Sequence, residues 1–187
     1  MTVPGKRIRF FGLCALALCI VLSGCSHQTD EEAIESSIAK RLDGYKNPDS
    51  SETANFAARM DIDSLSQYGV SMADFMKAYL DGFDYEITSV EVDEDTAVAT
   101  VVMRCKSFSG YEAALAAQAE ALGSDQQIAT MTTDELDQAF GEAILTSLEG
   151  VDVRDTDPIT ITFEKTDNVW MPVSDASDDI AAALLSN

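Results

Sequence analysis

Histidine, cysteine and basic side chains are scarce in this sequence. It has one His and four Cys, and 12 Lys and Arg oppose 33 Asp and Glu, which gives a formal net charge of −21. A chain this acidic repels nucleic acid and anionic lipid headgroups, so DNA and RNA are excluded as partners. Hydrophobic residues nevertheless make up 46% of the 187 residues, which excludes a wholly disordered chain.

The few His and Cys residues restrict the chemistry of the chain. Cys105 stands alone after residue 25, which leaves no disulfide within the domain, and we expect it to be buried as a small apolar residue. His27 lies near the N-terminus, which argues against a Ser-His-Asp triad and a zinc site of the usual composition. The Walker A, GxGxxG, GxSxG and HExxH motifs are absent. We therefore expect no catalytic residue, no metal and no cofactor.

The first 25 residues have the pattern of a secretory signal. Lys6, Arg7 and Arg9 form a basic head, and an apolar run of 13 residues follows at 10–22. A membrane-spanning helix needs about 20 apolar residues, so this run is too short to span a bilayer comfortably. Its removal would take away three basic residues and no acidic one, so the mature chain would be still more negative.

The segment ends in Leu22-Ser23-Gly24-Cys25, which resembles the lipobox of bacterial lipoproteins. In that family the Cys thiol receives a diacylglycerol, and the signal is cleaved directly before it. The resemblance therefore implies a cleaved signal peptide at 1–24 and a lipid anchor on Cys25 with acyl chains such as palmitate. Several acyl chains anchor a protein stably, because each buried CH₂ adds about 0.8 kcal/mol. We expect a protein held on the extracytoplasmic face of the cell membrane.

The remaining chain is expected to form a lipidated stem at 25–30 and a single acidic domain at 31–187. Periodicity and capping signals, including the pair Thr132 and Glu135, predict helical segments at 30–45, 52–60, 61–68, 71–81, 111–122, 134–148 and 175–185. Stretches rich in β-forming residues predict two hairpins, 85–92 with 97–108 and 159–164 with 169–173. An acidic loop is expected at 152–158.

The order of these segments predicts an α+β fold. We expect N-terminal helices on one face of a curved antiparallel sheet made of the two hairpins, with a helical pair inserted between them and a short C-terminal helix. Alternation along 97–106 assigns the odd-numbered residues from Ala97 to Cys105 to the core face. The even-numbered residues, Lys106 among them, fall on the opposite face.

Three stretches carry a second resemblance: Phe75-Met76-Lys77-Ala78-Tyr79, the hairpin YEITSVEVDEDTAVATVVMRCKSF, and VWMPV near the end. Through them, residues 32–173 resemble the nuclear transport factor two-like or cystatin-like domains of uncharacterised Gram-positive lipoproteins. In that family a curved sheet and helices can enclose a pocket, which implies a ligand site here. The residues it would use, which fit ordinary core packing equally well, are Phe83, Tyr85, Met103, Phe163 and Trp170.

These observations favour a non-catalytic binding or accessory lipoprotein. It would meet the membrane through Cys25 and bind a small apolar ligand or an envelope protein. One alternative is a small-molecule enzyme of the cone-shaped ketosteroid-isomerase-like fold, which would need a buried Asp base and a Tyr donor. A second is a Ca²⁺-dependent surface adhesion module that uses the acidic stretches 93–95, 152–157 and 175–179. Solvated turns and helix caps explain the same stretches.

Overall fold

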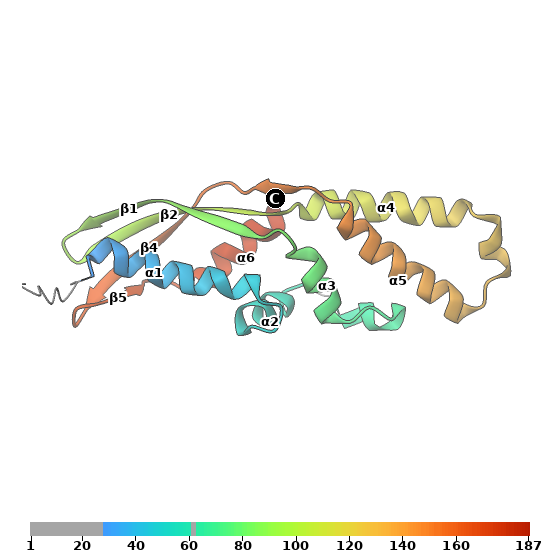
Figure 1. The fold of residues 1–187 in the computed structure, drawn as a ribbon, viewed down its shortest axis with the longest axis horizontal. Helices are drawn as coiled ribbons and strands as arrows, with labels where there is room; N and C mark the ends of the chain where they lie inside the picture. The colour runs from blue at the N-terminus through green and yellow to red at the C-terminus, as the bar shows by residue number, and fades with distance from the viewer. Residues whose placement is uncertain (1–27, 61–62) are drawn as a thin grey trace, which may run out of the picture.

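The chain forms an elongated α+β structure with a sheet towards one end and a helical hairpin at the other (Figure 1). The computed structural model describes residues 28–60 and 63–187. The predicted α+β class is confirmed. The predicted signal peptide, Cys25 and His27 lie outside the described residues.

The sheet has five antiparallel strands, and its long central strand is β2. The order is β1-β2-β4-β5, and β3 pairs with the end of β2. Both predicted hairpins form, and β2 joins them by pairing with β4 from Thr96↔Glu164 to Val101↔Ile159. The strands are β1 (Asp84–Asp93), β2 (Thr96–Lys106), β3 (Val153–Asp155), β4 (Ile159–Thr166) and β5 (Val169–Pro172).

The prediction of a loop throughout 152–158 is wrong, because β3 occupies its middle. This three-residue strand has one apolar residue, Val153, among charged residues, so it shows no alternation. Its pairing with β2, from Arg104↔Asp155 to Lys106↔Val153, defines the strand. A partner distant in the sequence therefore defines this strand, and no local pattern does.

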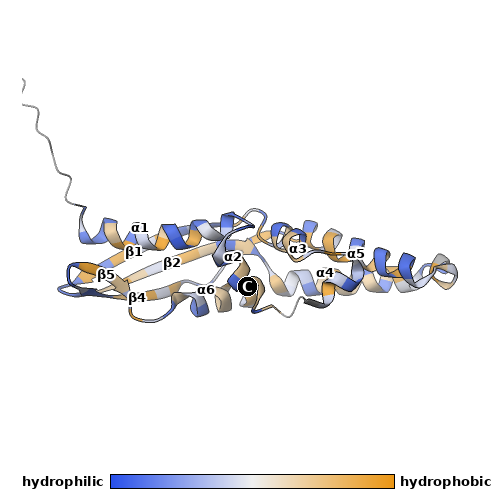
Figure 2. Ribbon diagram, turned by 90° about the horizontal axis from the view of Figure 1, so that it is seen from below, coloured by the Kyte–Doolittle hydropathy of each residue, from blue (hydrophilic) through white to orange (hydrophobic). Residues whose placement is uncertain are grey.

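The helices pack on one side of the sheet and beyond its end. Helix α1 lies along β1, and α6 lies along β4 (Figure 2). Helices α4 and α5 are the predicted inserted pair and extend away from the sheet (Figure 1). The helices are α1 (Asp30–Leu42), α2 (Ser51–Ala57), α3 (Met72–Tyr79), α4 (Phe108–Ser124), α5 (Thr133–Glu149) and α6 (Ala176–Ser186), with short 3₁₀ helices at Asp43–Lys46, Asp63–Tyr68 and Gln126–Thr130.

The hydrophobic core lies between the sheet and these helices. The odd-numbered residues of β2 are all buried, which confirms the predicted core face. Helices α1 and α6 cover them with the apolar stripes that their spacing predicts. The contributing side chains include Ile34, Ile38, Leu42, Ala97, Ala99, Val101, Met103, Cys105, Ile180 and Leu184.

A tyrosine of α3 connects the core to the end of α6. Tyr79 is fully buried, and its hydroxyl donates to the carbonyl oxygen of Leu184 at 2.8 Å. The last carbonyls of a helix have no partner within it, so this bond satisfies one of them. Burial raises the pKa of Tyr79 and keeps its hydroxyl protonated as a donor.

A glycine allows α5 to approach the 3₁₀ helix at Asp63–Tyr68. A Cβ atom added at Gly141 would lie only 2.1 Å from the carbonyl oxygen of Tyr68. Next to it, the rings of Tyr68 and Phe140 are 5.8 Å apart. Thr132 and Glu135 form the predicted capping box at the start of α5.

Candidate functional site

The start of α1 is fixed to the second hairpin by three side chains, which we call the N-terminal clamp: Asp30, Lys165 and Trp170. The Lys165 ammonium donates to both Asp30 carboxylate oxygens at 2.8 and 2.9 Å, and the Trp170 indole donates to one of them at 3.0 Å. The bonds from Lys165 and then Trp170 hold the pKa of Asp30 below its usual value. The clamp therefore attaches the last residue of the predicted stem to the sheet.

The five predicted pocket residues do not surround one hollow. Phe163 borders a cavity of about 50 Å³ between α1, the sheet and α6. Phe83 borders a surface hollow beside the end of α3, and Tyr85 and Met103 share another across β1 and β2. Trp170 is buried and belongs to the N-terminal clamp. Core packing accounts for the burial of all but the half-exposed Tyr85.

Tyr85, like Trp170, has a carboxylate partner among the predicted pocket residues. Its hydroxyl donates to Asp43 at 3.0 Å, and the Lys46 ammonium lies 4.7 Å from the centre of its ring. Partial burial and the bond to Asp43 raise the pKa of Tyr85. Asp43 is exposed, whereas the isomerase alternative requires a buried carboxylate beside the tyrosine.

Cys105 is buried, as the sequence predicts. The Asn187 side-chain amide lies 3.4 Å from both its sulfur and its carbonyl oxygen. Burial raises the pKa of the Cys105 thiol, so the reactive thiolate form is disfavoured at neutral pH.

The acidic stretches occupy turns, strand residues and a helix cap. Residues 93–95 lie at the β1–β2 turn. Within the stretch 152–157, residues Val153–Asp155 form β3. Asp175 is the N-cap of α6; it accepts bonds from Ser177 and forms a 2.8 Å ion pair with Arg41. Among residues 28–60 and 63–187, no three His, Cys, Asp or Glu side chains are placed to share a metal ion.

The feature that most resembles a built site has no signal in the sequence. We call it the Lys106 hollow, a depression of about 360 Å³ where α3 and α5 cover the end of β2. The Lys106 side chain is only 6% exposed, and its ammonium donates to the carbonyl oxygen of Ala78 at 2.8 Å. The hollow is lined by Asp74, Lys77, Ala78, Asp81, Lys106, Leu145 and Glu149.

The sequence placed Lys106 opposite the core face, where alternation favours exposure, and the structure buries it instead. At this end of β2, residues of α3 and α5 surround the Lys106 side chain, and its ammonium reaches the Ala78 carbonyl oxygen of α3. The alternation of side chains along β2 leads to the expectation that Lys106 faces solvent. Residues of α3 and α5 occupy that space instead. A lysine directly before the Ser107 helix cap gives no local signal of this burial.

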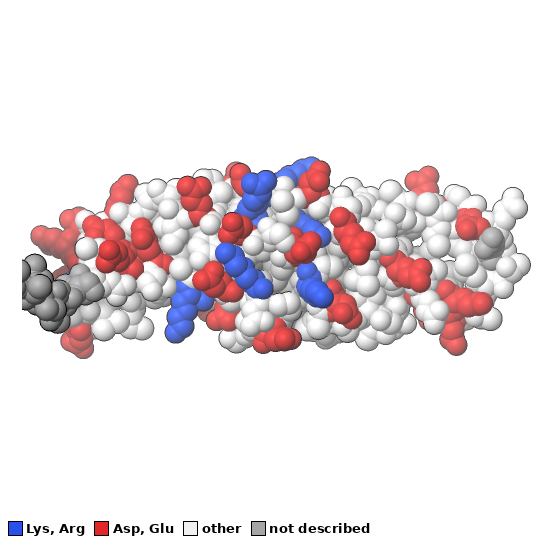
Figure 3. Space-filling model, in the orientation of Figure 1, with Lys and Arg blue, Asp and Glu red and all other residues white. Residues whose placement is uncertain are grey.

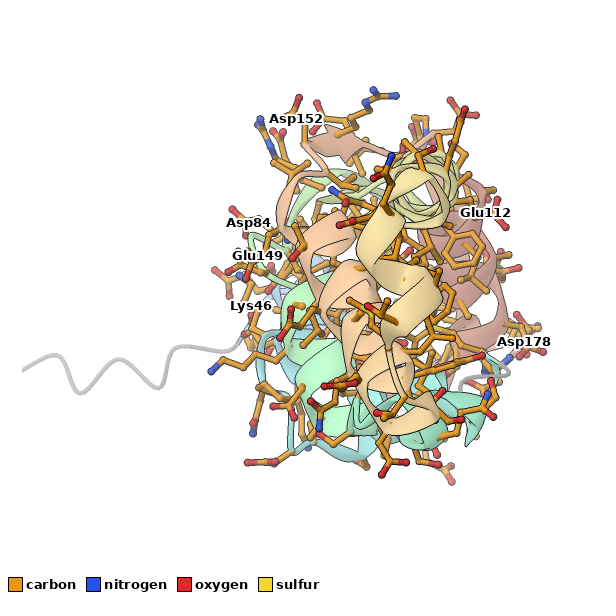
Figure 4. All side chains as sticks on the ribbon, turned by 90° about the vertical axis from the view of Figure 1, so that its right-hand side faces the viewer. Lys46, Asp84, Glu112, Glu149, Asp152 and Asp178 are labelled. Atoms are coloured by element: carbon orange, nitrogen blue, oxygen red, sulfur yellow. The ribbon has the colours of Figure 1, made fainter. Side chains whose placement is uncertain are left out.

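Basic side chains gather in the middle of this face of the molecule, with acidic ones over both ends (Figure 3). Lys77 and Asp81 also line the neighbouring hollow that contains Lys46, so the two depressions are adjacent. Viewed from the α4–α5 end, Lys46 and Glu149 lie on the same side of the molecule (Figure 4). The Lys106 hollow is therefore lined by charges of both signs and adjoins a second hollow.

Comparison with known proteins shows a shared fold. No protein-family model matches the sequence, and no curated protein matches it. A solved structure that does match is that of a "putative lipoprotein (ycdA)" from Bacillus subtilis subsp. subtilis str. 168, with a TM-score of 0.52 and 11% identity. The match covers 86% of this chain and 57% of that one, so this chain spans little more than half of its structural relative.

At this identity the likeness shows the fold alone, and the nuclear transport factor two-like or cystatin-like assignment stays a prediction. In the part of the chain that the structure describes, we find no helix with the length and apolarity to span a bilayer.

Proposed function

We propose that this protein is an extracytoplasmic lipoprotein, anchored through Cys25, whose domain is a non-catalytic binding or accessory module. The observation that carries the proposal is Leu22-Ser23-Gly24-Cys25 at the end of a basic and apolar leader. The fold shared with the putative lipoprotein of Bacillus subtilis supports it.

The contacts near the start of the domain determine which end of the sheet a lipid on Cys25 would hold near the bilayer. Cys25 precedes Asp30 by five residues, a reach of about 18 Å when fully extended. The N-terminal clamp attaches Asp30 to Lys165, whose backbone amide bonds to Asp95 in the β1–β2 turn at 2.8 Å. A lipid on Cys25 would therefore keep the turn end of the sheet near the bilayer.

The opposite end of the molecule would then point away from the membrane. Helices α4 and α5 extend beyond the far end of the sheet from the start of α1 (Figure 1). We infer that the anchored domain presents this helical hairpin and the Lys106 hollow to the envelope. A short stem suits an accessory module, since it limits how far the binding surface can move from the lipid.

The anchor is tested by metabolic labelling of the full chain with a palmitate analogue in a bacterial host. We expect the wild type to be labelled and membrane-bound, and Cys25→Ala to lose the label. The matched control is Cys19→Ala, which removes a cysteine of the same leader and should keep the label. Label on Cys25→Ala, or none on the wild type, would refute the anchor.

A further inference from the structure

We propose that the Lys106 hollow binds a short zwitterionic peptide, with the ligand carboxylate on Lys106. Three independent features carry this inference: the incompletely paired buried ammonium, the mixed charge of the rim, and the position of the hollow along the molecule.

The first feature is the ammonium of Lys106. A lysine is rarely this buried unless its charge is paired, because desolvating an unpaired charge is costly. An ammonium has three N–H donors, and within the described residues one of them has an acceptor, the Ala78 carbonyl oxygen at 2.8 Å. The Asp81 carboxylate is 3.9 Å away, which is too long for a hydrogen bond. A ligand carboxylate would accept the remaining donors.

The second feature is the rim of the hollow. Asp74, Asp81 and Glu149 are exposed carboxylates, and Lys77 is an exposed ammonium beside them. A ligand with only negative charge would be repelled by the three carboxylates. A zwitterion can pair its carboxylate with Lys106 and its ammonium with the rim.

The size and wall of the hollow agree with a small ligand. Its volume of about 360 Å³ lies at the lower end of the range of small-molecule sites. Leu145 supplies an apolar surface on which a methyl or similar side chain could pack. A dipeptide of alanine combines these properties and is the probe that we choose.

The third feature, which rests on the proposed function, is distance from the membrane. Lys106 lies ten residues along β2 from Thr96, about 34 Å at the usual rise per residue. Thr96 lies at the turn end of the sheet, which the lipid on Cys25 would hold near the bilayer. A ligand of the envelope therefore fits this site better than a lipid headgroup.

The experiment is calorimetric titration of the full chain, purified in detergent, with L-alanyl-L-alanine and D-alanyl-D-alanine. We expect at least one of them to bind stoichiometrically. Its N-acetylated form, which lacks the ammonium, and its amidated form, which lacks the carboxylate, should each bind at least about tenfold more weakly, since one charge-assisted contact is lost.

Variants locate the binding. Lys106→Met should reduce the affinity at least about tenfold, whereas Lys40→Met, which alters an exposed lysine of α1, should not change it. Because Lys106→Met alters a buried residue, Glu149→Gln provides a second test at the exposed rim and should weaken binding several-fold. Unchanged binding by both hollow variants would overturn the proposal.

Further titrations distinguish a zwitterionic peptide from a phosphate or a lipid headgroup as the ligand. Failure of both dipeptides to bind, or tighter binding of inorganic phosphate or glycerophosphoethanolamine, would overturn the assigned ligand class. The titration in detergent does not depend on acylation, and the labelling of Cys25 does not depend on Lys106. The two experiments can therefore refute the lipid anchor and the peptide site separately.

Discussion

The close approach of α5 to Asp63–Tyr68 predicts opposite effects for one substitution at two glycines. Gly141→Ala would place a methyl group 2.1 Å from the Tyr68 carbonyl oxygen, and this backbone atom cannot rotate away. Such overpacking costs about 1–3 kcal/mol, and the short contact favours the upper end. Alanine regains about 1 kcal/mol over glycine in a helix, so we expect a net loss of about 2 kcal/mol.

Gly123→Ala is the matched control. Gly123 lies in α4, has no atom within 4 Å of an added Cβ, and has no positive φ. The same methyl group should therefore stabilise the protein by about 0.5–1 kcal/mol, because glycine loses more backbone freedom on folding.

Urea unfolding and calorimetry of the two variants measure this difference. For a chain of this size, 1 kcal/mol shifts the melting temperature by about 2–4 °C. Gly141→Ala should therefore melt about 4–8 °C lower than the wild type, and Gly123→Ala about 1–4 °C higher. If Gly141→Ala is as stable as Gly123→Ala, the contact between α5 and Tyr68 is not as close as described.

Three further predictions concern Tyr79, Asp30 and Cys105. Tyr79→Phe leaves the Leu184 carbonyl oxygen unpaired and should cost about 1–3 kcal/mol in urea unfolding; no loss would remove its role as a cap. The pKa of Asp30 is lowered in the folded state, so its carboxylate stabilises the fold above the unfolded pKa of about 4, and this contribution is lost as the pH falls further. The stability gap between wild type and Asp30→Asn should therefore shrink from neutral pH towards about pH 2, and a constant gap would contradict the clamp. A thiol reagent should label native Cys105 slowly and the unfolded chain stoichiometrically, whereas rapid native labelling would show that the thiol is accessible.

Elements defined by local patterns could be predicted from the sequence. The alternation from Ala97 to Cys105 gave the core face of β2, and the Thr132–Glu135 spacing gave the start of α5. These signals involve residues that are close in the sequence. Their physical cause, side-chain direction or end capping, acts over the same few residues.

Features created by distant segments could not be predicted. The burial of Lys106 depends on α3 and α5, and β3 is a strand because it pairs with β2 almost fifty residues earlier. The family resemblance implies a pocket role for Trp170, but its indole donates to Asp30, which lies 140 residues away. An inward apolar residue has the same local pattern whether it lines a pocket or fills the core.

The placement of α4 and α5 between β2 and β3 has a consequence for motion. Helix α4 has one buried residue, Tyr111, near its start, so its far turns depend on α5 for their tertiary support. Strand β2, by contrast, is hydrogen-bonded on both sides. Amide hydrogens in the far turns of α4 should therefore exchange through local opening of the hairpin, while those of β2 exchange only when the whole domain unfolds.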